Sequence, residues 1–511
     1  MESGVSPGKA PPPHVGGYPR LVYVNGPGRS CPNEIVAFVG RRANPGYAFL
    51  LPNLDWRVKL MTMSAANTAE SAAPVLRDSF PRMMVLRQQF PASPPLDISA
   101  SLAAQFAALR SRIKPGSRLA VAVGSRGISN LQRIVAAVLG ILKGAGAHPF
   151  LVPAMGSHGG ATPEGQKQIL AEYGLTEERL QVPIHAAMEV ERIGATPEGL
   201  EVFFSAEARR ADGIVVVNRV KPHTDFSSDS LGSGILKMMV VGLGKRVGAA
   251  NYHTSSSRRG YEHVLRSMAQ VILRSAPIFG GVAIVENQFH STARVVVLPV
   301  ESIESGEAEL FREARRLMPK LPFDDIDLLI VDRLGKNISG AGMDPNIIGR
   351  GVHGYSSLLG HRPASGPTIR RLFVRELTPE THGNAVGIGL ADVTTARLAR
   401  SIDLEVTRIN ALTALTPQCA KIPVQFETDR EAIERTLASL ALREPSEAKI
   451  VRIADTLSLE KLEVSEACAE FFSGRKDLEV LGRAEEMRFD DSGNLRPLRV
   501  NGAPAQVGHG A

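Results

Sequence analysis

The stretch from Arg118 to Pro163 reads RLAVAVGSRGISNLQRIVAAVLGILKGAGAHPFLVPAMGSHGGATP, and it decides the fold class. Two short apolar runs, LAVAV and FLVPAM, each end in glycines, and a helical pattern lies between them. Nearly continuous apolar runs of this length are typical of parallel strands covered on both faces. The alternation of strand, glycine-rich turn and helix therefore predicts an α/β protein.

The same pattern continues further along the chain. A third apolar run, in ADGIVVVNRVKPHTDF (211–226), is stopped by Pro222, and the Met-rich segment GSGILKMMVVGLGKRVGAANYH (232–253) follows. Thr162 and Pro163 have the residue types of a helix N-cap and first helical position. Because ligands in open α/β sheets gather at the carboxyl ends of strands, we expect the ends of these three strands to share one cleft.

The length of 511 residues predicts more than one domain. Residues 1–75 are rich in Pro, Gly and small polar residues, which predicts a disordered extension. We expect an α/β catalytic domain over 76–320, a second α/β domain over 321–490 with a cleft between the two, and a flexible tail over 491–511. A polar helix and linker around 304–325 mark the boundary.

Composition excludes several classes of protein. The net charge of +7 is dispersed and aromatic residues make up only 5%, so neither a phosphate-tracking surface nor base-stacking platforms are expected. No apolar run approaches the length of a membrane span. The cysteines Cys31, Cys419 and Cys468 lie far apart, which argues against zinc ribbons, iron–sulfur sites and disulfide scaffolds. We therefore expect a cytoplasmic protein that binds neither nucleic acid nor membranes.

Three candidate site residues lie at predicted strand ends. Arg126 in the turn Gly124–Gly127 could hold a carboxylate or phosphate through its guanidinium, although a surface arginine in a tight turn would look the same. His158, flanked by glycines, and His223, after Pro222, could each exchange a proton near neutral pH. The alternative for both histidines is a hydrogen bond within their own turns.

Lys237 and His253 form a fourth candidate site. A lysine within GILKMMVVGLG would be partly desolvated, which lowers the pKa of its amine and favours a nucleophile that can bond covalently to a cofactor. His253 could be a metal ligand. Taken alone, a lysine whose charged end reaches solvent at the edge of an element explains Lys237 better, and a lone histidine is more often structural.

The motifs GSRGISN, PAMGSHGGAT, NRVKPHTDF, SGILKMMVVGLGK with the following NYH, and DRLGKNISGAGMDPN occur in this order over residues 80–475. Taken together, this series resembles the nickel-pincer-dependent isomerases related to lactate racemase. The resemblance implies a two-domain α/β racemase or epimerase of small 2-hydroxy acid-like substrates. It also implies partner proteins that synthesise the cofactor, and it leaves the oligomeric state open.

The resemblance assigns the cofactor and its contacts. The cofactor of this family is the nickel-pincer nucleotide, pyridinium-3,5-bisthiocarboxylic acid mononucleotide nickel, with one arm tethered to a lysine that corresponds to Lys237. His253 corresponds to the histidine that completes the nickel coordination, and imidazole suits a square-planar nickel site. Ser125, Gly156 and Gly242 correspond to further cofactor-binding positions.

Substrate contacts and proton transfer are assigned in the same way. His158 and His223 correspond to the acid and base, Arg126 to the residue that holds the substrate carboxylate, and Lys336 to a partner from the second domain. The implied reaction passes a hydride from the substrate carbon to the pyridinium ring and back to the opposite face.

This sequence departs from lactate racemase within these motifs. Val123 replaces an acidic residue, Ser125 a threonine and Gly159 an arginine. These differences favour another hydroxy acid, a sugar acid or another alcohol as the substrate. A non-catalytic binder of an anionic metabolite remains the alternative, while the lack of a P-loop or dinucleotide fingerprint weakens a nucleotide-dependent transferase or oxidoreductase.

Overall fold

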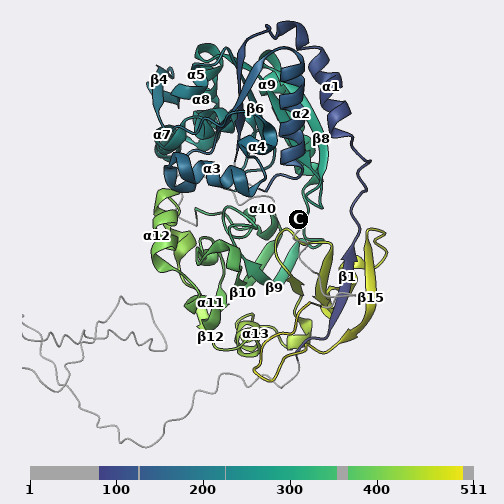
Figure 1. Ribbon diagram of the computed structural model, residues 1–511. Helices are drawn as coiled ribbons and strands as arrows, with labels where there is room; N and C mark the ends of the chain where they lie inside the picture. The colour runs from purple at the N-terminus through teal and green to yellow at the C-terminus, as the bar shows by residue number, and fades with distance from the viewer. Residues whose placement is uncertain (1–79, 125–126, 225, 354–365, 499–511) are drawn as a thin grey trace, which may run out of the picture. The chain divides into compact units, whose positions relative to one another are not determined.

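The computed structural model describes residues 80–124, 127–224, 226–353 and 366–498. The protein is a mixed α/β protein with two main mixed sheets and one small hairpin (Figure 1). The predicted α/β class is therefore confirmed. The hairpin consists of β4 (Val190–Ala195) and β5 (Glu201–Ser205).

The first sheet has five strands in the order β3-β2-β6-β7-β8. The first four are parallel, and β8 runs antiparallel to β7. The bounds of these strands are β2 (Arg118–Val123), β3 (His148–Pro153), β6 (Gly213–Arg219), β7 (Ile278–Glu286) and β8 (Thr292–Pro299). Because the parallel strands point the same way, β3, β2 and β6 end at one edge of the sheet.

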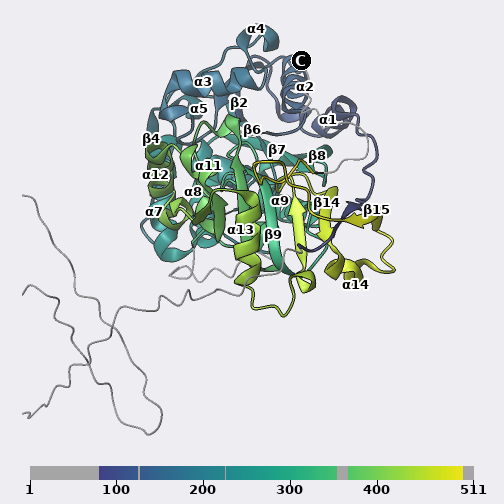
Figure 2. The same cartoon turned by 90° about the horizontal axis from the view of Figure 1, so that it is seen from below.

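Alternate residues of these strands enter two different apolar cores, as expected for a sheet that is covered on both faces. On β2, Val121 belongs to one core and Ala122 to the other. The first core holds α1 (Ile98–Ala107) and α2 (Leu131–Gly144), which lie side by side in both views (Figure 1, Figure 2).

The second core of this sheet is formed by later helices. They are α7 (Lys245–Arg259), α8 (Tyr261–Ser275) and α9 (Ile303–Leu317), together with the short α5 (Ala206–Arg209) and α6 (Ile235–Lys237). Two more helices follow β3, namely α3 (Pro163–Glu172) and α4 (Glu177–Leu180). The Thr162 side chain accepts a hydrogen bond from Gly165 N at 3.1 Å, which confirms the predicted N-cap with Pro163 in the first turn.

The second sheet has eight strands in the order β12-β11-β10-β9-β13-β14-β1-β15. The strands from β12 to β13 are parallel, and β14, β1 and β15 are joined by antiparallel pairings. Their bounds are β1 (Met83–Gln88), β9 (Asp325–Leu334), β10 (Thr368–Leu377), β11 (Val393–Thr395), β12 (Val424–Phe426), β13 (Ile450–Ile453), β14 (Lys461–Ser465) and β15 (Leu478–Glu485).

Short helices follow the strands of this sheet. They are α10 (Pro345–Ile348), α11 (Ala396–Arg400), α12 (Leu404–Thr413), α13 (Asp429–Ala438) and α14 (Ala469–Phe472). The helix that the sequence predicted around residues 304–325 is present as α9, and strand β9 follows it.

Strand β1 joins the second sheet although it precedes the whole first sheet in the chain. It pairs with β14, where Met83 faces Ser465, and with β15 on its other side (Figure 1). The sequence pattern placed residues 76–320 together, and it held no sign of this pairing. The division of the chain near residue 320 stays a prediction.

The predicted extension over residues 1–75 lies outside the described residues, as does most of the predicted tail over 491–511. Within the described part of that tail, Leu495 is buried. The carbonyl oxygen of Arg496 accepts a hydrogen bond from Arg452 at 2.8 Å. The first residues of the tail therefore pack against the second sheet.

A network of buried ion pairs stabilises the second sheet. Asp332 on β9 accepts two hydrogen bonds from Arg452 on β13, both at 2.9 Å, and forms an ion pair with Arg375 on β10 at 2.9 Å. Burial by itself would lower the pKa of Arg375, but the carboxylates of Asp332 and Asp429 raise it above its ordinary value. Arg375 therefore stays charged inside the protein, and both guanidinium groups depend on the carboxylate of Asp332.

Asp332→Ala should lower the free energy of unfolding by about 3–5 kcal/mol, because it leaves two buried guanidinium groups without a shared partner. Denaturant unfolding of the purified variant measures this loss. The matched control is Glu427→Ala, which breaks the pair with Arg400 in which both side chains are 68% exposed, and which should cost less than about 1 kcal/mol. Equal losses in the two variants would contradict this account.

Candidate functional site

Three strands of the first sheet end against one helical segment. This segment consists of α6 and a π-helical turn, Met238–Gly242, and it lies immediately before α7. After β2, a Cβ added at Gly124 would lie 2.4 Å from Cε of Met238. After β3, Gly156 N donates to Gly242 O at 3.1 Å. On β6, Asn218 donates to Gly234 O at 2.8 Å. The ends of these three strands therefore meet one helical segment, and the cleft that the sequence predicted there stays a prediction.

The structure brings Lys237 and His223 into contact. Lys237 is the last residue of α6, and its amine forms a hydrogen bond with Nε2 of His223. His223 is buried and follows β6, whereas Lys237 is half-buried. A π-helical turn begins directly after Lys237, and such turns are frequent at functional sites.

An aromatic cluster connects His223 with His253. The His223 ring stacks on Phe226 with a centroid distance of 4.8 Å, and Phe226 stacks on Tyr261 at 5.6 Å. Tyr261, at the start of α8, lies edge-on to His253 of α7 at 6.4 Å. Phe226 and Tyr261 are buried, so both histidines border an apolar, water-poor region.

His158 lies in the loop after β3 and is half-buried. This loop packs against the helical segment and α7, because a Cβ at Gly156 would lie 3.1 Å from Val241 O and 3.5 Å from Cβ of Ala249. Gly156 has a φ of 60°, a conformation that favours glycine. Ala249 precedes His253 by one helical turn, so the loop meets the helix face that bears His253.

Three further site residues were predicted from the sequence. Ser125 and Arg126 lie outside the described residues. Lys336 follows β9, and its amine donates to Gly340 O of its own loop at 2.6 Å. The roles of these three residues stay predictions.

Two residues that follow β9 nevertheless reach the segment with His223. Asn346 of α10 donates to the carbonyl oxygen of His223 at 3.2 Å, and Asp344 forms an ion pair with Lys221 at 3.6 Å. His353 stacks on Tyr261 at 5.6 Å. Sequence reasoning missed all three, because nothing local in the sequence links them to residues more than ninety positions earlier.

A buried acid, Glu307, fixes the start of the helical segment and was also missed. It lies on α9, is 1% exposed, and accepts a hydrogen bond from Leu236 N at 3.0 Å. A Cβ at Gly234 would come 2.3 Å from its carboxylate, so only glycine fits there. Burial raises the pKa of Glu307 to about 7, against the opposing effect of the backbone hydrogen bonds. In the sequence, the only sign of this role is that Glu307 lies on the apolar face of an amphipathic helix.

A pocket adjoins His223. It encloses about 430 Å³, counted with its open mouth, and its walls include His223, Phe226, Arg315, Lys320 and Asn346. Arg315 pairs with Asp229 at 2.8 Å. The pocket therefore combines one candidate proton-transfer group with basic side chains.

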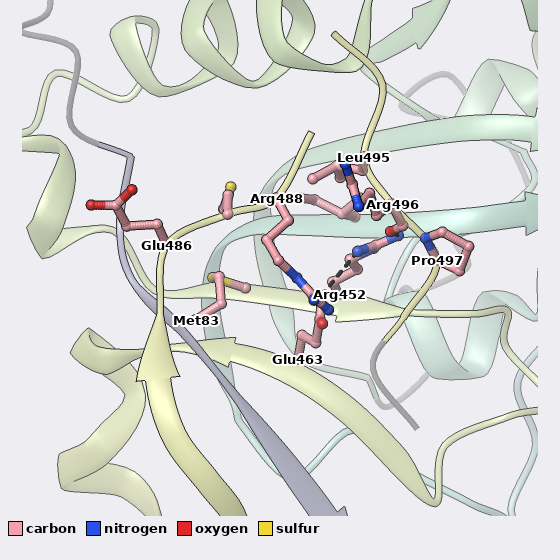
Figure 3. A pocket seen from close by; sticks show the side chains of 10 residues that line it. Met83, Arg452, Glu463, Glu486, Arg488, Leu495, Arg496 and Pro497 are labelled. Carbon is pink, nitrogen blue, oxygen red and sulfur yellow. Dashed lines mark hydrogen bonds and ion pairs between the residues drawn. The ribbon is translucent and has the colours of Figure 1, made fainter. Parts of the chain in front are cut away.

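A second pocket, of about 350 Å³, lies on the second sheet and contains none of the described predicted site residues. Figure 3 shows Arg452 bonded to Glu463 in its wall, with Arg488 and Arg496 nearby. Arg452 is engaged by both Asp332 and Glu463.

Two properties of the described residues concern metal binding and membranes. Across the described residues, no three His, Cys, Asp or Glu side chains gather in a way that could hold a metal ion. No helix in the described part of the chain has the length and apolar character that a membrane crossing requires.

Residues 85–261 match the family model of the lactate racemase N-terminal domain. This part of the chain is similar to the lactate racemase N-terminal domain. It contains every predicted site residue except Lys336, and the resemblance that the motifs indicated is confirmed for it. The contact between Lys237 and His223 lies within the matched residues.

Comparison with other proteins adds a solved structure. The lactate racemase apoprotein from Thermoanaerobacterium thermosaccharolyticum aligns with 77% of this chain and 91% of its own, with 14% sequence identity and a TM-score of 0.41. No curated protein sequence matches the chain significantly.

Glu307→Gln should abolish a pH dependence of stability. The wild-type carboxyl has a pKa of about 7 in the folded protein and an ordinary value of about 4.5, so the folded state binds the proton more tightly. Its contribution is fully present below about pH 4.5 and is lost as the pH rises through 7, a difference of about 3 kcal/mol. Denaturant unfolding at pH 5 and pH 8 measures it.

The glutamine amide oxygen can still accept from Leu236 N, so the variant should lose less stability than the wild type between these two pH values. Glu309→Gln, which alters an exposed residue of the same helix, is the control and should follow the wild type. A wild-type slope retained in Glu307→Gln would refute the assignment.

Proposed function

We propose that the protein is a racemase or epimerase of small 2-hydroxy acid-like substrates that uses a nickel-pincer nucleotide tethered to Lys237. The observation that carries the proposal is the contact between Lys237 and His223 within the residues that match the lactate racemase N-terminal domain. A non-catalytic binder of an anionic metabolite would not require an amine and an imidazole to meet at the ends of parallel strands.

The residues around Lys237 suit such a cofactor. The amine is on a half-buried residue at the end of a fixed helical turn, so it can form a covalent bond without a large entropic cost. Gly156 and Gly242, the predicted cofactor-binding glycines, are joined next to this turn by a backbone hydrogen bond of 3.1 Å. His253 offers an imidazole nitrogen, a donor that nickel accepts readily, and the pincer arms would supply the remaining donors.

When bound, the pyridinium ring would supply a site that accepts and returns a hydride. The protein's own residues then handle the proton and the orientation. One of the two imidazoles, His158 or His223, removes the hydroxyl proton of the substrate, and the other serves when the substrate is bound in the mirror configuration. Arg126 holds the substrate carboxylate, and Lys336 contributes a charge from the second sheet's loops.

The aromatic cluster contributes by excluding water. Phe226 and Tyr261 are 6% and 1% exposed, and they cover the His223 ring and the approach to His253. In a water-poor site, hydrogen bonds to developing charge are stronger than in solution. The exchange of hydride and proton would also be protected from solvent. We place this reaction in the cytoplasm, where the cofactor-synthesis proteins would load the enzyme.

Lys237→Arg tests the tether. Arginine keeps a cation that can donate to His223, but it does not form the covalent bond. After co-expression with the cofactor-synthesis proteins, the intact mass of the wild type should include an adduct that maps to Lys237, and the variant should have none. Lys167→Arg, at an exposed lysine paired with Glu177, is the control and should keep the adduct. An active, nickel-loaded wild type without an adduct would sink the proposal.

Histidine variants test the division of roles. His158→Gln and His223→Gln should each lower the inversion rate by about 10²–10⁴-fold, the usual contribution of a general acid or base, while adduct and nickel content stay unchanged. His253→Gln should lose nickel on dialysis and keep the adduct. The binder alternative predicts instead that the wild type binds hydroxy acids without an adduct and without inverting them, which equilibrium binding and chiral chromatography distinguish.

A further inference from the structure

A buried lysine, Lys245, connects α7 to the end of β3. It is 0% exposed and stands at the first position of α7, eight residues before His253. Its amine donates to Pro153 O at 2.6 Å and to Oε1 of Gln166 at 3.2 Å. Pro153 is the last residue of β3, so this amine holds the strand from which the His158 loop departs.

Gln166 extends this connection to the His158 loop itself. It lies on α3, is 0% exposed, and its side-chain amide donates to Gly156 O at 3.1 Å and to His158 O at 3.4 Å. Its amide oxygen accepts a hydrogen bond from the Lys245 amine, so both the oxygen and the nitrogen of the side-chain amide have partners. A continuous set of buried hydrogen bonds therefore runs from α7 through Gln166 to the backbone of His158.

The choice of a lysine at this position requires an explanation. Burial lowers the pKa of Lys245 to about 8, with Glu189 acting in the opposite direction. Its hydrogen-bond acceptors are a carbonyl and an amide rather than a carboxylate, so desolvation of the amine is poorly compensated. An apolar side chain of similar length would fill the same volume without that cost. What the lysine alone provides is the pair of hydrogen bonds to Pro153 and Gln166.

We propose that Lys245 is a positioning residue for His158: acting through Gln166, it fixes the loop Gly156–His158 relative to α7, the helix that carries His253. This inference rests on the proposed function in assigning a proton-transfer role to His158. Lys245 itself touches neither substrate nor cofactor. Because an error of about 1 Å in the position of a catalytic group can cost about a hundredfold in rate, a loosened loop should impair turnover.

The first test uses the full chain without cofactor and so does not depend on the proposed reaction. Lys245→Met should raise hydrogen exchange of the amides over residues 154–161, and the rate at which diethyl pyrocarbonate modifies His158, at least severalfold. The control is Lys143→Met, which removes an exposed lysine that also donates to two backbone carbonyls, Leu180 O and Gln181 O. The control should leave both rates at the wild-type value.

The second test uses the cofactor-loaded enzyme. Lys245→Met should lower kcat by about 10–100-fold and change KM by less than about twofold, with the adduct and nickel content retained. A general loss of structure would instead lower the loaded fraction and raise KM. Gln166→Glu keeps an acceptor for Lys245 but lacks the amide donor, and it should reproduce the loss of kcat. The double variant should be no slower than either single variant, because both changes break one network.

The outcomes separate this inference from the proposed function. Wild-type exchange and modification rates in both Lys245→Met and Gln166→Glu overturn the positioning role. A wild type with no adduct and no turnover overturns the proposed function, whereas the exchange and modification rates still decide whether Lys245 fixes the loop. If Lys245→Met does not fold, Gln166→Glu supplies the same measurements.

Discussion

The close approach of two backbones at Gly156 and Gly242 is the constraint on which the site depends. The amide of Gly156 donates to Gly242 O at 3.1 Å, and a Cβ at Gly242 would lie 2.6 Å from Ala154 O. A side chain at either position would force the His158 loop away from the segment that carries Lys237. This contact joins the loop that carries His158 to the segment that carries Lys237.

Two buried ionisable residues stand at the ends of that segment. At the start of the segment, Glu307 accepts a hydrogen bond from the backbone N–H of Leu236, and Lys245 lies just beyond the end of the segment. Glu307 comes from another element, α9, and the Lys245 side chain reaches another element, β3. The segment is therefore fixed at both ends by groups whose burial costs desolvation free energy.

The sequence predicted the features that local pattern determines. The apolar runs, their terminal glycines and the Thr162-Pro163 pair specified β2, β3, β6 and the start of α3, because strands, turns and caps depend on neighbouring residues. Glu307 and Gln166 were missed because their partners lie 71 and 79 residues away. A single sequence contains no signal for which distant buried polar groups will meet.

The pairing of β1 has a consequence for how the chain can fold. Met83 faces Ser465 on β14 and Glu485 on β15, which follow it by 382 and 402 residues, so β1 closes the longest loops among the strand pairings described above. During synthesis the first sheet can form as its strands emerge, whereas β1 must wait until β14 and β15 have left the ribosome. While it is unpaired, this apolar strand exposes backbone groups that can pair with other chains and cause aggregation. A chaperone that shields nascent N-terminal segments would therefore raise the yield of the native protein.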